Sequence, residues 1–69
     1  MTDARILEVR TTREVARVQV PDVDINPEDS LGWALWLTRE VNIRRLGNPD
    51  DYRVHVWHRT KGWIEHRRG

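Results

Sequence analysis

Two stretches near the N-terminus alternate between apolar and polar residues and are rich in β-branched side chains, ARILEVR from residue 4 and REVARVQV up to residue 20. A short polar turn over residues 11–14 separates them, and this pattern predicts a β-hairpin. Pairing Arg10 with Val15 across the turn sends alternate residues to opposite sides. The predicted core side consists of Leu7, Val9, Ala16, Val18 and Val20. The predicted opposite side consists of Ile6, Glu8, Arg10, Val15, Arg17 and Gln19.

A second alternating stretch, YRVHVWHR, lies near the C-terminus and is joined by TKG to WIEHRR. Because Gly62 tolerates the positive φ of a tight turn, these residues predict a second hairpin. Pairing Arg59 with Trp63 separates an apolar side from a basic, aromatic side. The apolar side consists of Tyr52, Val54, Val56 and Ile64. The other side consists of Arg53, His55, Trp57, Arg59, Trp63, Glu65 and Arg67.

The segment between the hairpins carries the signals of one helix. Asn26 is suited to cap free amide groups, and Pro27 is suited to the first helical position. At the other end, Gly47 is suited to the left-handed capping conformation, and Pro49 cannot continue a helix. These signals predict a helix over residues 27–46.

The order strand, strand, helix, strand, strand predicts an α+β fold of the ββαββ type in one small domain, residues 1–69. Its two hairpins would form a four-stranded sheet with the helix packed on one face. For the strand order we consider a β-grasp-like arrangement, in which the first and last strands lie side by side and parallel. This analogy concerns architecture and implies no function.

Large apolar residues occur on both halves of the predicted helix. With about 100° between successive residues, the half expected to face the sheet contains Leu31, Ala34, Leu35, Leu37, Thr38, Val41 and Leu46. The other half contains large residues that one sheet cannot reach at the same time. In one interpretation, the indole rings fold back against their own sheet. In the interpretation we favour, a homodimer about a two-fold axis buries them. The predicted protein interface consists of Trp33, Trp36, Arg39 and Ile43.

The composition of the chain indicates in which compartment and from which kind of genome we expect the protein. The chain has no cysteine, no apolar run approaching the roughly 20 residues that span a bilayer, and no signal-peptide pattern. We therefore expect a soluble, cytoplasmic protein without membrane contact. Eleven of the twelve basic residues are arginine, which favours a GC-rich bacterial or phage genome. The formal net charge of +1 gives no bulk attraction to nucleic acid.

The candidate residues for catalysis and for metal binding do not form a complete pattern. Asp22, Asp24 and Asn26 match the first ligands of a calcium-binding loop, but Pro27 and Trp33 replace its essential Gly and Glu. His55 and His58 point to opposite faces of a strand, whereas His58 and His66 share a face without a carboxylate. Ser30, the one serine, has no signature that ties it to a base. We expect no cofactor, no metal site and no enzymatic activity.

The basic, aromatic side of the sheet is the other candidate surface. Arginines that neutralise phosphates, together with aromatic rings on which bases stack, suit a single-stranded nucleic acid. Glu8 and Glu65 would partly neutralise this surface. The residues predicted to take part are Arg10, Arg17, Arg53, His55, Trp57, Arg59, Trp63, Arg67 and Arg68.

These observations predict a small non-enzymatic protein-interaction module that self-associates and has a regulatory or accessory role. The alternative is a nucleic-acid-binding protein that uses the arginines and tryptophans of the outer sheet face. The predicted partners are a second copy of the chain and another protein, with nucleic acid as the alternative partner.

Overall fold

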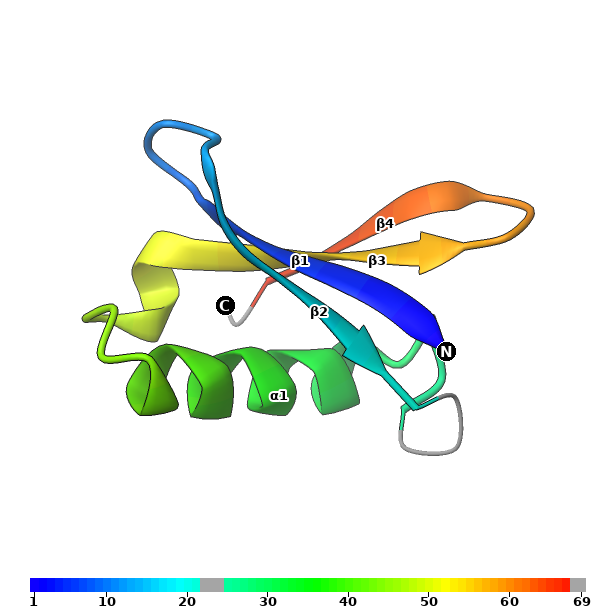
Figure 1. The fold of residues 1–69 in the computed structure, drawn as a ribbon, viewed down its shortest axis with the longest axis horizontal. Coiled ribbons are helices and arrows are strands. Elements are labelled where there is room, and N and C mark those ends of the chain that lie inside the picture. Colours follow the sequence, from blue (N-terminus) through cyan, green and yellow to red (C-terminus); the bar gives the residue numbers. More distant parts are fainter. Residues whose placement is uncertain (22–24, 68–69) are drawn as a thin grey trace.

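A computed structural model describes residues 1–21 and 25–67 of the chain. Two strands, β1 (Thr2–Glu8) and β2 (Glu14–Val20), are followed by helix α1 (Ser30–Ile43). A 3-10 helix, η1 (Pro49–Asp51), then leads into β3 (Tyr52–His58) and β4 (Gly62–Arg67). The strands form one antiparallel sheet in the order β2-β1-β3-β4, and α1 packs on one face of it (Figure 1). The predicted α+β fold of the ββαββ type is confirmed.

The β-grasp-like strand order is wrong, because β1 pairs with β3 in an antiparallel arrangement and β4 lies at the edge. The amide of Val9 donates to the carbonyl of Asp51 at 2.9 Å, which joins the end of β1 to the start of β3. The difference in apolar content between β3 and β4 accounts for this strand order. Strand β3 buries Tyr52, Val54 and Val56, whereas β4 begins with Gly62 and is the less apolar strand. The more apolar strand therefore takes the central place, where both of its edges are covered.

The predicted register of the first hairpin is also wrong. Ala16 pairs with Ile6 rather than with Val9, and an irregularity follows at the next position, where Leu7 pairs with Glu14. The turn is longer than predicted, since the amide of Glu8 donates to the carbonyl of Arg13. A shift by three residues inverts the faces of β1. Ile6 therefore lies in the core, and Leu7 lies on the opposite face.

In the second hairpin the predicted faces are confirmed, although the register differs by two residues. Trp57 pairs with Trp63 and His58 pairs with Gly62, so the turn consists of residues 59–61. Gly62 has a positive φ of 77°, as its place beside the turn requires. A shift by two residues leaves every side chain on the face that alternation assigned to it.

Helix α1 is shorter than predicted at both ends. Asp29, rather than Asn26, caps its first turn, because the Asp29 carboxylate accepts from the amide of Gly32 at 3.0 Å. Asn26 instead accepts from the amide of Glu28 in a preceding turn. At the C-terminal end Arg45 adopts a left-handed φ of 55°, and the amide of Leu46 donates to the carbonyl of Val41. This pairing is a Schellman motif, which ends the helix before Gly47 is reached.

The helix is also rotated relative to the prediction. Trp33 is fully buried and Trp36 nearly so, and both pack into the core cluster with Leu37 and Val41. The indole N–H of Trp33 donates to the carbonyl of Asn26 at 2.9 Å, which satisfies its one polar group. The rings of Trp33 and Trp36 meet edge to face, with centroids 5.2 Å apart. The prediction that Trp33 and Trp36 point away from the sheet is therefore wrong.

The same rotation exposes two residues that were expected to face the sheet. Leu31 and Leu35 lie in solvent, as Ile43 does on the far side of α1. Of the predicted protein interface, Arg39 and Ile43 remain exposed. The indoles are buried because they are the longest apolar side chains of α1 and extend furthest beneath the sheet.

Replacement of the capping residue tests the observed start of α1. We expect Asp29→Ala to lower the free energy of unfolding by about 1 kcal/mol, because the amide of Gly32 loses its acceptor. Asp29→Asn, which retains a capping oxygen, should leave stability nearly unchanged. Denaturant titration of both variants and of Asn26→Ala measures these effects. A larger loss for Asn26→Ala than for Asp29→Ala would contradict this helix start.

Candidate binding face of the sheet

The face of the sheet opposite α1, called the outer face below, carries polar and aromatic side chains from all four strands. The strand registers and the two-residue alternation define its members, and the irregularity in the first hairpin adds Glu14, which pairs with Leu7. They are Asp3, Arg5 and Leu7 of β1, Glu14, Arg17 and Gln19 of β2, Arg53, His55 and Trp57 of β3, and Trp63, Glu65 and Arg67 of β4.

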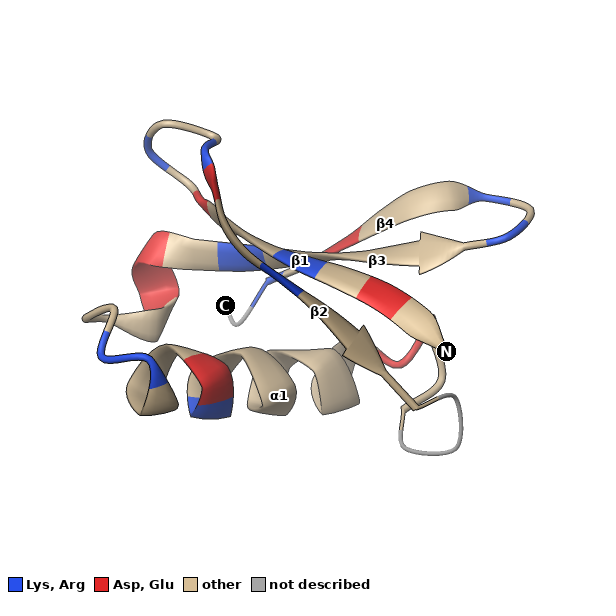
Figure 2. Ribbon diagram, viewed as in Figure 1, with Lys and Arg blue, Asp and Glu red and all other residues tan. Residues whose placement is uncertain are grey.

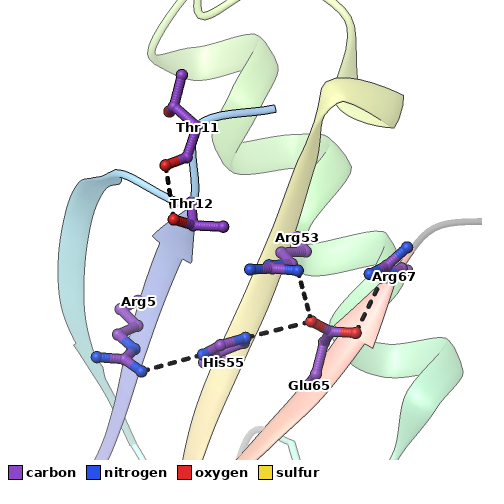
Figure 3. Close-up of polar contacts among 7 residues, drawn as sticks. All are labelled: Arg5, Thr11, Thr12, Arg53, His55, Glu65 and Arg67. Carbon is purple, nitrogen blue, oxygen red and sulfur yellow. Dashed lines mark hydrogen bonds and ion pairs between the residues drawn. The ribbon is translucent and has the colours of Figure 1, made fainter. Parts of the chain in front are cut away.

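One row of side chains crosses the outer face from edge to edge. Arg17 pairs with Arg5 across β2 and β1, Arg5 pairs with His55 across β1 and β3, and His55 pairs with Glu65 across β3 and β4. The guanidinium of Arg5 lies 3.1 Å from Nδ1 of His55 (Figure 3). Arginine can only donate, so Nδ1 must be the unprotonated acceptor. In the neutral ring Nε2 then carries the hydrogen and donates to Glu65, 3.4 Å away.

The Glu65 carboxylate is held by three side chains. Arg53 and Arg67 each lie 3.0 Å from one of its oxygens, and His55 shares the oxygen that binds Arg53 (Figure 3). Burial alone would raise the pKa of Glu65, but the hydrogen bonds from His55 and Arg67 and the nearby arginine charges outweigh it. The resulting pKa lies below the usual value. Glu65 is therefore a negative charge that orders two arginines on the β3–β4 side of the outer face.

The two tryptophans of the outer face stand next to each other. Trp57 and Trp63 form an edge-to-face pair with centroids 5.3 Å apart. The guanidinium carbon of Arg5 lies 4.2 Å from the centroid of the Trp63 ring, and that of Arg17 lies 5.6 Å from it. Both distances are within the range of cation–π contact. Trp57 keeps 45% of its surface exposed, so its ring is the free aromatic surface here.

Basic charge gathers on this side of the molecule. Both hairpin turns rise away from α1, and basic residues appear at both of them and along the strands (Figure 2). The turns contribute Arg10, Arg13 and Arg59 and no carboxylate; Lys61 instead binds the Glu28 carboxylate. Together, the outer face and the two turns carry seven arginines and three carboxylates. Their formal charge is +4, whereas the whole chain carries +1. The remainder of the chain is therefore negative.

The structure brings together six of the nine residues predicted for nucleic-acid contact. These six on the outer face are Arg17, Arg53, His55, Trp57, Trp63 and Arg67. Arg10 and Arg59 lie in the two turns, so their predicted place on the strands is wrong. Arg68 lies outside the described residues. Glu8 does not share this face, because it has the parity of Ile6.

Arg5 is the basic outer-face residue that the sequence analysis missed. The wrong register of the first hairpin placed Leu7 on the core side, and Arg5 has the same parity as Leu7. Ile6 and Leu7 are adjacent, so alternation alone could not decide which of them is buried. The two residues are flanked by polar side chains, Arg5 before them and Glu8 after them, and this symmetry gave no decisive signal either.

The remaining histidines have partners of their own. His66 is buried, and its Nε2 lies 2.9 Å from the carbonyl of Pro27. Nδ1 of His58 accepts from the amides of Thr60 and Lys61 in the β3–β4 turn. Within residues 1–21 and 25–67, no group of three or more His, Asp or Glu side chains is placed to hold a metal ion. Asp22 and Asp24, of the calcium-loop pattern, lie outside the described residues.

Fold and surface together define a ββαββ protein with one covered and one open sheet face, the open face lined by arginine and tryptophan. Comparisons of the chain with known protein families, with curated protein sequences and with solved structures find no match. The described part of the chain contains no helix with the length and hydropathy that crossing a membrane requires.

Titration of His55 tests the hydrogen-bond row. Burial lowers its pKa most, the hydrogen bond to Glu65 raises it, and the charges of Arg5 and Arg53 lower it further, for a net shift below the usual value. An unfolded chain then binds the proton more readily than the folded protein. Stability supplied by neutral His55 is therefore present above the unfolded pKa and is lost as pH falls toward the folded pKa.

We expect the free energy of unfolding to fall between about pH 7.5 and pH 5.5, within the range where histidine charge changes. In His55→Gln this fall should be smaller, and denaturant titration at both pH values measures the difference. In Arg5→Met the NMR-detected pKa of His55 should rise, because one opposing charge is removed. An unchanged His55 pKa in Arg5→Met would contradict the contact between these two side chains.

Proposed function

We propose that the protein binds single-stranded nucleic acid on the outer face of its sheet. The observation that carries this proposal is that one open sheet face carries both kinds of group: Arg5 and Arg17 lie beside the Trp57–Trp63 pair, and Arg53 and Arg67 lie further along the same strands. Guanidinium groups contact phosphates, and an aromatic ring stacks on bases of any sequence. The open face of the sheet presents both kinds of group to an extended strand.

The charge distribution supports the same proposal. The outer face and its turns carry a formal charge of +4, so phosphates would meet the side of the protein that attracts them. Trp63 is covered by the guanidinium of Arg5, whereas Trp57 is open to a base. Bound nucleic acid would therefore stack on Trp57 and run across Arg5 and Arg17 toward the turn with Arg10 and Arg13.

The protein-interaction module that self-associates is the second candidate function. Its predicted interface loses Trp33 and Trp36, which are buried in their own subunit. It is favoured by a different observation, the exposure of Leu31, Leu35 and Ile43 on α1. A regulatory or accessory role fits either kind of binding and is part of this proposal.

Removing two arginines tests the nucleic-acid proposal. Arg13 is exposed in the turn and the side chain of Arg17 is 52% exposed, so Arg13→Gln with Arg17→Gln should leave the fold intact. We expect tight binding of a labelled oligo(dT) of about 12 nucleotides, within the roughly 4–16 nucleotides of such sites. The double variant should reduce the slope of log affinity against log salt by about 1.4, because each lost phosphate contact removes about 0.7.

The matched control is Arg44→Gln with Arg45→Gln, which removes the same charge at the end of α1, away from the outer face. Fluorescence anisotropy between about 50 and 200 mM salt compares the three proteins. The control should bind as the unmodified protein does. Equal weakening of both double variants, or no binding at the lowest salt, would contradict the proposal.

Stacking on Trp57 gives a second test. Trp57→Ala should weaken oligo(dT) binding by about 1–3 kcal/mol, and Trp57→Phe should retain most of the affinity, because phenylalanine also offers a flat ring. Binding should quench the tryptophan fluorescence of the unmodified protein more than that of Trp57→Phe. Unchanged affinity in Trp57→Ala would show that this ring does not contact the bases.

A further inference from the structure

Helix α1 presents a line of apolar side chains to solvent on the side away from its own sheet. Leu31, Leu35 and Ile43 are 71%, 64% and 66% exposed. They follow a four-residue spacing, with Arg39 as the fourth member, and residues four apart are neighbours on a helix surface. Three large apolar residues in one line are more than isolated exposure, which is ordinary on protein surfaces. They are called the α1 stripe below.

A groove lies directly beside this stripe, between α1 and β2. It encloses about 670 Å³ and is lined by Val18, Val20, Ile25 and Trp36, with Arg39 and Glu40 on the side of α1. A smaller hollow of about 260 Å³ links it to the stripe and is lined by Gly32, Leu35 and their neighbours. Because β2 is an edge strand of the sheet, the groove is open on one side.

The groove has a simple geometric origin. Strands are spaced about 4.8 Å apart, so a helix about 10 Å wide covers roughly two of them. The strand contacts of α1 are mainly with β3 and β4. The inner side of β1 and β2 is therefore covered by the long rings of Trp33 and Trp36 and by no second helix. One further helix would complete the layer.

We propose that a second copy of this chain supplies that helix. The two copies associate about a two-fold axis with their α1 helices antiparallel, so that the two α1 stripes pack against each other and each helix closes the open side of the other copy's groove. Each pair of helices is then enclosed between two sheets. The same element carries both the stripe and one wall of the groove, so a single two-fold contact satisfies both at once.

The spacing of residues along α1 fits this symmetry. A two-fold axis at the level of Leu37 places residue 31 opposite residue 43 of the partner and residue 35 opposite residue 39. Leu31 then packs against Ile43 of the partner subunit, and Leu35 packs along the aliphatic stem of the partner's Arg39. Every member of the stripe has a counterpart in this register.

Charge complementarity supports the antiparallel arrangement. Asp29 precedes the helix and Arg45 follows it, and both are exposed; their neighbours Glu28 and Arg44 already pair with Lys61 and Glu40. Antiparallel packing brings the acidic end of one helix to the basic end of the other. The dipoles of the two helices are then antiparallel, so the positive end of each lies beside the negative end of the other. A parallel arrangement would place like charges together at both ends and is disfavoured.

The size of the contact sets its strength. A stable interface of standard size buries about 800 Å² on each partner, which is about a sixth of the 4664 Å² accessible surface of this chain. One helix face with one groove is at or below that size. We therefore expect a reversible dimer with a dissociation constant in the micromolar range, about −8 kcal/mol. The outer face takes no part in it, so failure of this proposal leaves the proposed function standing.

Analytical ultracentrifugation from low to high micromolar concentration tests the association directly. We expect a reversible monomer–dimer equilibrium for the full chain. A monomer throughout this range, or assembly that continues beyond the dimer, would overturn the proposal. The same measurement with oligo(dT) present separates association by α1 from assembly on nucleic acid.

Opposite charges at Leu35 test the register. Leu35→Arg faces the partner's Arg39 across the axis and should abolish the dimer, whereas Leu35→Glu meets the same arginine and should retain it. Leu35 is exposed in the single chain, so neither variant should alter circular dichroism or thermal stability of the monomer. Dissociation of both variants to the same extent, or a dimer of Leu35→Arg, would refute this arrangement.

Cross-linking gives a second measure of the register, because the chain has no cysteine. Under oxidation, a mixture of Leu31→Cys and Ile43→Cys proteins should form a disulfide-linked heterodimer. Each variant alone should remain uncross-linked, since the axis separates the two copies of each position. Cross-linking of either variant alone, without a disulfide-linked heterodimer in the mixture, would show a parallel contact and contradict the proposal.

Discussion

A single helix packs on the inner face of the four-stranded sheet. Because this helix is too narrow to cover four strands, the rest of the structure depends on how the remaining inner face is buried. A helix shields about two strands, and the strand contacts of α1 are mainly with β3 and β4. Trp33 and Trp36 extend the cover beneath β1 and β2, and both are buried. Their length explains the rotation of the helix, because leucine in the same positions would leave the sheet open. The edge-to-face contact of the two rings and the bond from Trp33 to the carbonyl of Asn26 hold them there.

The outer face follows from the same arrangement. With no second layer above it, the sheet can carry charged side chains there without an apolar cover. They are nevertheless ordered, because Glu65 binds Arg53 and Arg67, and His55 connects Glu65 to Arg5. Arg5 in turn lies over the Trp63 ring. This network fixes the positions of several guanidinium groups before any ligand arrives, and preorganised groups lose less entropy on binding.

The sequence was sufficient for the elements and for three of the four strand faces. Alternation identified the second hairpin so clearly that a register error of two residues changed no face. In the first hairpin the longer turn and the irregularity at Leu7 shifted the pairing by three residues, and alternation could not reveal either feature. Arg5 was missed for this reason. The rotation of α1 was missed because hydropathy treats indole and leucine alike, whereas their lengths decide which of them reaches the uncovered strands.

The outer face and the α1 stripe lie on opposite sides of the sheet, so both can be occupied at the same time. A contact on α1 would bury the stripe and the groove, yet every outer-face residue would remain open to solvent. Two copies joined by their helices would then point their outer faces in opposite directions. A single strand of nucleic acid could not lie flat across both faces, and each face would hold its own segment. Two linked segments would gain effective concentration from the dimer, so a micromolar association at α1 would strengthen binding to a long strand more than to a short one.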